Sequence, residues 1–149
     1  MSLAAQDLAD LQQLANRYWA LADLLEDVPL AELFETDAAF DLGTIKLEGL
    51  LAIEAFLANR AKGMRETERT TRHVATNFLA LPEGPDQVRV RSIGLVYAAN
   101  GPWPLEAAAP SGIADFDDIC RRQPDGSWRY HYRSGRTVFV GPNAASFAR

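Results

Sequence analysis

Apolar residues recur at intervals of three and four positions between residues 7 and 25, which is the spacing that places them on one face of a helix. A shorter helical pattern covers residues 30–34 behind Pro29, and a third begins after Gly49 and continues to residue 68. Between them, residues 38–42 fit a strand that ends near Gly43. The first half of the chain is therefore predicted to be mainly helical.

The pattern becomes alternating at about residue 72, which predicts strands for the second half and places His73 and Asn77 on one face. Turn residues at 82–86 and 123–126 then divide the chain into two hairpins, with strands predicted at 72–79, 88–96, 113–122 and 128–136. The proline- and glycine-rich segment 99–112 is predicted to be a lid or an edge-covering loop. Residues 137–149 are predicted to be a peripheral C-terminal extension.

Helices and one strand followed by antiparallel hairpins define the α+β class. A chain of 149 residues fits one domain, residues 1–149, that can bury both a core and a ligand cavity. A strongly bent sheet that wraps around the helices would enclose a conical pocket, and His73 could point into it.

Charge and cysteine content narrow the class of partner and the compartment. Residues 1–60 hold 3 basic and 11 acidic side chains, and the whole chain has a net charge of −5. This balance argues against nucleic acid as a partner, because phosphate binding requires dense basic surface. The chain has one cysteine, Cys120, and neither a signal-peptide pattern nor an apolar run of membrane-spanning length. We therefore expect a cytoplasmic protein without a membrane partner.

His73 is the strongest candidate for chemistry, because histidine exchanges protons near neutral pH. Asp23 lies beside Trp19 at the border of the first helical stripe, from where its carboxylate could face water or lean over the pocket. Each residue also has a simpler interpretation. His73 alone fits a hydrogen-bonded structural histidine, and Asp23 alone fits a solvated helix residue.

Other polar and aromatic residues allow two interpretations as well. Asn77 could contact substrate or tie down backbone. His131 is predicted to lie on the outer face of the last strand, with Arg129 and Arg133 on its side and Trp128 and Tyr130 opposite. The arginines near the C-terminus, with Asp115, Asp117 and Asp118, fit a polar sheet face better than an RNA-binding surface. The large aromatic residues fit either the core or a ligand pocket, and this applies to Tyr18, Trp19, Phe40 and Phe56.

No recognised motif for a metal or a cofactor occurs in the sequence. Two histidines 58 residues apart and one cysteine give no ligand spacing, so we predict no metal. The chain also lacks a phosphate-binding glycine loop and a nucleophilic serine motif. This pattern favours acid/base chemistry without a cofactor.

Three phrases carry a resemblance to a known family: residues 18–34 with Asp23, the segment 71–77 around His73, and residues 117–122 followed by 125–129. Together they make the chain similar to SnoaL-like and scytalone-dehydratase-like proteins of the NTF2-like superfamily. The resemblance implies a cystatin/NTF2-like cone, in which a strongly curved antiparallel sheet wraps around the N-terminal helices. It also implies a homodimer or a higher homo-oligomer formed through the sheet.

The resemblance implies site residues as well. Dehydratases of this family pair a first-helix aspartate with a strand histidine, and these positions match Asp23 and His73. A tyrosine used by one such enzyme matches Tyr18. The further acid/base residue that these enzymes carry on the next strand has no counterpart at residues 96–98, where Tyr97 is the available donor. Trp19, Phe40, Phe56, Asn77 and Tyr97 are the expected substrate contacts.

The sequence thus predicts a cofactor-independent lyase or isomerase, resembling a dehydratase, that uses His73 and Asp23 on an apolar, cyclic, oxygenated small molecule. The alternative is a non-catalytic module that binds a small ligand or dimerises. A deep pocket that holds both side chains within hydrogen-bond distance would favour the enzyme, whereas a filled cone would favour the module.

Overall fold

The computed structural model describes residues 2–148 and contains two α-helices and six strands. In chain order the elements are α1 (Ala5–Ala22), the 3₁₀ turn η1 (Leu30–Glu32), β1 (Phe34–Asp41), β2 (Lys46–Glu48), α2 (Leu50–Glu66), β3 (Arg69–Pro82), β4 (Gln87–Asn100), β5 (Gly112–Arg122), β6 (Trp128–Val140) and the 3₁₀ turn η2 (Ser146–Ala148). The α+β class predicted from the pattern is confirmed. None of the helices in residues 2–148 has the length and apolarity needed to cross a membrane.

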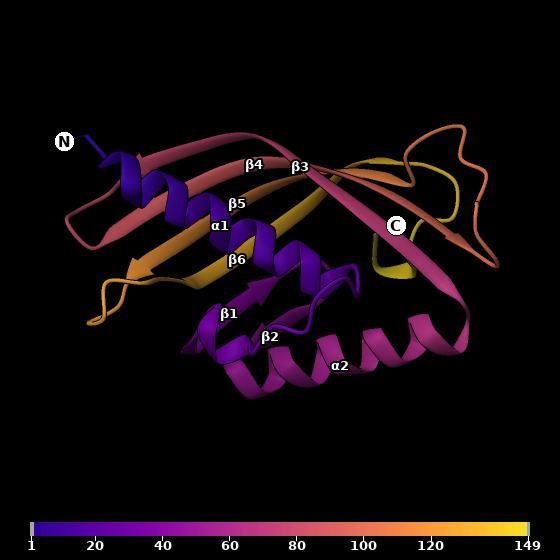
Figure 1. Ribbon diagram of the computed structural model, residues 1–149, viewed down its shortest axis with the longest axis horizontal. Helices are drawn as coiled ribbons and strands as arrows, with labels where there is room; N and C mark the ends of the chain where they lie inside the picture. The colour runs from indigo at the N-terminus through magenta and orange to yellow at the C-terminus, as the bar shows by residue number, and fades with distance from the viewer. Residues whose placement is uncertain (1, 149) are drawn as a thin grey trace.

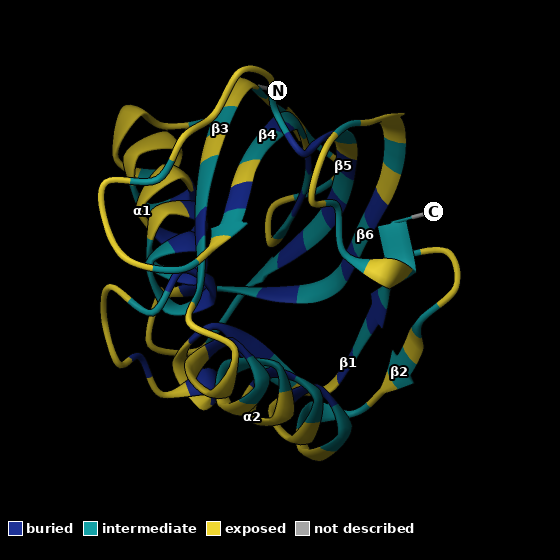
Figure 2. Cartoon of the chain, turned by 90° about the vertical axis from the view of Figure 1, so that its right-hand side faces the viewer, coloured by how far each residue is buried: buried dark blue, intermediate teal, exposed yellow. Residues whose placement is uncertain are grey.

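The six strands form one curved sheet in the order β2-β1-β6-β5-β4-β3. Its arc closes around α1 and α2, which lie on the concave side (Figures 1 and 2). The sheet is mixed, because β1 runs parallel to β6 while the other neighbours are antiparallel. The prediction of an antiparallel sheet was wrong at this pair, since hairpin turns in the sequence report only on strands that follow one another.

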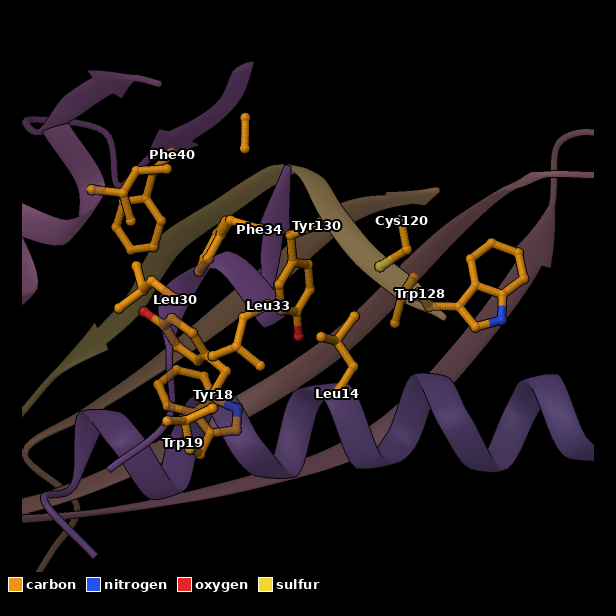
Figure 3. Packing of buried hydrophobic residues seen from close by; sticks show 14 of the residues in the cluster. Leu14, Tyr18, Trp19, Leu30, Leu33, Phe34, Phe40, Cys120, Trp128 and Tyr130 are labelled. Atoms are coloured by element: carbon orange, nitrogen blue, oxygen red, sulfur yellow. The ribbon is translucent and has the colours of Figure 1, made fainter. Parts of the chain in front are cut away.

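The core lies between the apolar stripe of α1 and the concave face of the sheet. Tyr18 packs edge-on against Trp19, Phe34 and Tyr130, with ring centroids 4.9 to 6.1 Å apart (Figure 3). The helix ends at Ala22 rather than at Leu25, because the backbone turns there and Leu24 takes a positive φ of 57°. This early end leaves Asp23 as the C-terminal cap of α1.

A bulge in β6 changes which side chains face the core. In β6 the pairing slips between Tyr130 and Tyr132, so that a bulge at His131 reverses the alternation. Arg133 therefore points inward and is 1% exposed, although it was predicted to share the outer face with His131. Asp118, also assigned to a polar face, is buried beside it. A bulge cannot be recognised from alternation, because alternation assumes that every residue is paired.

The prediction for residues 137–149 was wrong in part. Residues 137–140 belong to β6 rather than to a peripheral extension, and the segment after them folds back against the cavity beside α2 (Figure 1). The loop after β4 covers the outer side of the sheet instead, where Trp103 donates a hydrogen bond to Thr70 over 2.8 Å. The loop was predicted as a lid or an edge cover, and its contact with Thr70 places it on the outer side of the edge strand β3.

Candidate active site

His73 and Asp23 are hydrogen-bonded partners at the inner end of α1. The Nδ1 atom of His73 lies 2.6 Å from Oδ1 of Asp23, and the backbone N–H of His73 donates to Oδ2 over 2.7 Å. Thr71, two residues earlier on the same face of β3, donates its hydroxyl to Oδ1 over 2.7 Å. The carboxylate therefore holds both the imidazole and the strand that carries it.

Asp23 lies at a position that disfavours an ionised carboxylate. It caps the C-terminus of α1, where the helix dipole is negative, and its side chain is 3% exposed. Burial alone would raise the pKa of Asp23, but the hydrogen bonds from His73 and Thr71 and the charge of His73 lower it below the usual value. The fold thus keeps a buried carboxylate ionised beside an imidazole.

An ionised Asp23 determines which ring nitrogen of His73 carries the proton. The carboxylate can only accept, so Nδ1 must donate, and the basic nitrogen of the neutral ring is Nε2. Within residues 2–148, Nε2 has no hydrogen-bond partner. A substrate proton can therefore be accepted at Nε2, while Asp23 stabilises the imidazolium that forms.

The imidazole lies between two adjoining chambers of the cone. The outer chamber has a volume of about 280 Å³ and a mostly apolar lining, whereas the inner chamber measures about 90 Å³. Both are lined by Leu42, Arg60, His73, Phe116 and Phe147. A small apolar molecule in the outer chamber would reach the histidine without displacing the core.

The structure brings most of the predicted site residues together. Tyr18, Trp19, Phe40 and Phe56 line the inner chamber, and Trp19 also stacks on the His73 ring. Asp23 lies behind the ring as described above.

Asn77 and Tyr97, which were expected to contact substrate, lie elsewhere. Asn77 occupies the β3 bulge with a positive φ of 53° and is exposed, so the bulge removes it from the face of His73. Tyr97 lies on the outer side of β4 beside Trp103, because its neighbours Val96 and Ala98 are the ones that line the outer chamber. Neither residue lines the chambers beside His73.

Sequence reasoning missed four residues of the site. Thr71 supports Asp23, Arg60 and Phe116 line both chambers, and Phe147 closes them from the C-terminal segment. The carbonyl oxygen of Phe147 accepts a hydrogen bond from Thr44 over 3.1 Å, which fixes the segment in place. The inward alternation of Thr71 with His73 was the one available signal, since the other three positions depend on tertiary packing.

A buried ion pair lies behind the site. Arg133 donates a hydrogen bond to Asp118 over 2.8 Å, and its guanidinium faces the rings of Tyr18 and Trp19 at 4.1 and 4.9 Å. Burial raises the pKa of the Asp118 carboxyl to about 7, while the positive charge of Arg133 acts in the opposite direction. The Nε and Nη2 atoms of Arg133 are buried without a partner in residues 2–148. Through these contacts the ion pair holds the rings of Tyr18 and Trp19 in position.

A separate group of possible metal ligands, Glu35, Asp37 and His131, lies outside the two chambers, with ligand atoms within 4.8 Å of one another. Two of its three members already have partners, because Glu35 accepts from Gln123 over 2.9 Å and contacts His131 Nδ1 at 2.7 Å. The guanidinium of Arg121 lies 3.1 Å from His131. The nearby guanidinium of Arg121 and the hydrogen-bonded atoms of Glu35 and His131 indicate a surface hydrogen-bond network rather than a metal site. Sequence spacing could not show this cluster, since β1 and β6 meet only in the fold.

The cone, with one acid/base pair inside an apolar cavity, defines a protein of the NTF2-like class. Residues 4–134 match the model of a family described as the SnoaL-like domain. The chain therefore belongs to the SnoaL-like family, which includes isomerases and dehydratases, and the predicted family is confirmed. No curated protein matches the sequence.

Solved structures of low sequence identity share the fold. A protein from Novosphingobium aromaticivorans, provisionally named a scytalone dehydratase, is 20% identical with a TM-score of 0.71, over 93% of this chain and 88% of that one. ActVI-ORFA from Streptomyces coelicolor is 16% identical with a TM-score of 0.73, over 91% and 97%. A protein of unknown function with a cystatin-like fold from Nostoc punctiforme is 21% identical with a TM-score of 0.67, over 97% and 98%. These similarities confirm the cystatin-like fold.

Proposed function

We propose that the protein is a cofactor-independent lyase or isomerase that uses His73 as a general base on an apolar, cyclic, oxygenated small molecule. The observation that carries the proposal is the 2.6 Å contact between His73 Nδ1 and Asp23 Oδ1 beside a ligand-sized cavity. Nε2 removes a proton next to a substrate carbonyl, which leaves an enolate. The same proton then returns to another carbon in an isomerisation, or to a leaving hydroxyl in a dehydration.

Several features support catalysis over ligand binding alone. Burial and the negative end of a helix both disfavour an ionised carboxylate, and Asp23 is nevertheless kept ionised there by three hydrogen bonds that it accepts from Thr71 and His73. The His73 ring lines both chambers, and its Nε2 atom has no hydrogen-bond partner in residues 2–148, so it is available to a ligand. The cavity itself argues against a filled cone whose only role is dimerisation.

The test does not require the natural substrate. A general base of this kind exchanges the α-protons of a bound ketone, so the protein is incubated in D₂O with hydroxylated aromatic and steroid-like cyclic ketones. Deuterium incorporation is followed by NMR, and loss of water or isomerisation is followed by mass spectrometry and chromatography. We expect enzyme-dependent exchange that His73→Gln lowers about 10²- to 10⁴-fold.

His131→Gln is the matched control, because His131 is the other histidine of the chain and lies outside both chambers. It should leave the exchange rate unchanged. Equal exchange by the folded His73→Gln variant would overturn the proposal. Tight ligand binding without any exchange would favour the non-catalytic module.

We also propose that the protein forms a homodimer through the outer side of the sheet. Val74, Leu79 and Tyr97 expose apolar surface on the adjacent strands β3 and β4. Light scattering after size exclusion should give twice the monomer mass, and Val74→Glu should reduce it. Leu51→Glu, on the exposed face of α2, is the control, and it should leave the measured mass of the dimer unchanged. A monomeric parent protein would contradict this proposal.

A further inference from the structure

Two arginines line the outer chamber together with His73. Arg60 comes from α2, and Arg69 begins the same face of β3 that carries Thr71 and His73. Most other residues of this lining are apolar or small, so these are the two fixed positive charges at a mainly apolar surface. Such a position is costly for a guanidinium unless a negative charge is near.

Neither arginine has an acidic partner in the part of the chain that the structure describes. Arg60 donates to the carbonyl oxygen of Ala22 and, over 3.4 Å, to the hydroxyl of Thr71. Arg69 donates to the Asn100 side chain over 3.3 Å and to the carbonyl oxygen of Asn143 over 2.7 Å. All these acceptors are neutral, and no carboxylate of residues 2–148 lies within 4.0 Å of either guanidinium.

The two charges also act on each other. Burial lowers the pKa of Arg69, and the positive charge of Arg60 lowers it further. Asp23 makes no ion pair with either guanidinium, and both of its oxygens accept hydrogen bonds from Thr71 and His73. The chamber therefore has a positive character in a chain whose net charge is −5. A negatively charged ligand would relieve this repulsion.

We propose that Arg60 and Arg69 bind a carboxylate carried by an otherwise apolar cyclic ligand in the outer chamber. This inference rests on the proposed function, since it names the substrate class of the same cavity. A carboxylate has two oxygens that match the planar donor geometry of a guanidinium, and the chamber of about 280 Å³ accepts one or two rings beside it. Arg60, which lies next to Thr71, would also bring the acid close to His73.

The test compares two ligands of equal shape and different charge, 2-naphthoate and 2-naphthamide, by isothermal titration calorimetry. We expect the protein to bind 2-naphthoate at least about tenfold more tightly than the amide. Arg60→Met and Arg69→Met should each weaken binding of 2-naphthoate about tenfold. Each should change binding of 2-naphthamide little. Arg60→Lys, which keeps the charge, should lose less than Arg60→Met.

Arg65→Met is the matched control, because Arg65 lies on α2 but outside both chambers. It should leave binding of both ligands unchanged. If Arg60→Met does not fold because α2 loses its contact with Ala22, Arg69→Met still tests the proposal. Equal binding of acid and amide, or an acid preference that Arg69→Met leaves intact, would overturn it.

These measurements separate this inference from the proposed function. If the protein prefers the carboxylate but exchanges protons on no ketone, the proposed function is wrong and the proposed ligand class is still supported. Exchange on neutral ketones that depends on His73, with no preference for the acid, would overturn the ligand class alone.

Discussion

The imidazole of His73 lies flat against the indole of Trp19, with ring centroids 4.3 Å apart and planes inclined by 17°. Asp23 holds the edge of the imidazole while Trp19 covers one face, so the ring cannot rotate without losing a contact. The basic nitrogen is thereby fixed in direction. Trp19 itself is held by the Phe116 ring and by the guanidinium of Arg133.

Replacing Trp19 should therefore impair catalysis by misplacing the base. We expect Trp19→Leu to lower the exchange rate on a responsive ketone about tenfold or more, because small displacements of a reacting group are costly. Trp19→Phe keeps a flat ring against His73 and should retain more of the rate. The readout is the rate at saturating ketone, compared with the melting temperature of each variant. A loss that is the same in both variants would contradict a positioning role.

The carboxylate of Asp23 should make stability depend on pH in the acid range. The pKa of Asp23 is lower in the folded protein than its usual value of 3.8, so its contribution is fully present above that value and is lost as pH falls through the folded pKa. At pH 6 we expect Asp23→Asn to lower the free energy of unfolding by about 1–3 kcal/mol. This difference should shrink between pH 4 and pH 3.

Urea unfolding at several pH values measures this dependence. Asp27→Asn is the control, since Asp27 is exposed in the loop that follows α1. It should change the free energy of unfolding little at any pH. A difference between parent and Asp23→Asn that stays constant from pH 6 to pH 3 would show that the charge of Asp23 contributes nothing.

The site was predictable as far as local periodicity extends. The helical stripe placed Trp19 in the core and Asp23 at the border of the stripe, where its direction stayed open, and alternation placed His73 facing inward from β3. Alternation failed beyond each bulge, which is why Asn77 and Arg133 were assigned to the wrong faces.

Contacts between segments distant in the sequence were the second feature that local patterns could not predict. Nothing in the local pattern shows that β1 pairs with β6, or that Phe147 returns to the cavity wall. The roles of Arg60 and Arg69 have the same origin, because an arginine in a polar helical extension and one at the start of a strand look ordinary until the fold places them at one chamber. The resemblance predicted that His73 and Asp23 lie together, as their hydrogen bond shows, and packing determines what surrounds them.

The buried pair of Arg133 and Asp118 should show strong coupling. Removing one partner leaves an uncompensated charge, so we expect Asp118→Leu and Arg133→Met each to cost about 3–5 kcal/mol of unfolding free energy. The double variant Asp118→Leu with Arg133→Met should recover most of the loss, because two apolar side chains leave no charge buried.

Urea unfolding of the four proteins gives the coupling energy. Arg89→Met is the control, because Arg89 on β4 pairs with Asp117, the neighbour of Asp118 on β5, but is partly exposed. It should lower the unfolding free energy much less than the loss of either buried partner, because an exposed ion pair contributes little. Additive losses in the double variant would contradict the coupling and would assign each residue an independent packing role.

Gly135 provides a way to narrow the outer chamber without touching the acid/base pair. A Cβ atom at this position would lie 2.7 Å from the Phe116 ring and 3.1 Å from Leu42, both of which line the chamber. Gly135→Ala should therefore push Phe116 into the cavity, lower stability by about 1–3 kcal/mol and weaken binding of a two-ring ligand. Ala55→Gly, on α2, is the control, because Ala55 is exposed and lies outside both chambers, so this substitution should lower stability by about 0.5–1 kcal/mol and leave ligand affinity unchanged. Unchanged ligand affinity in a destabilised Gly135→Ala would show that bound ligands do not reach Phe116.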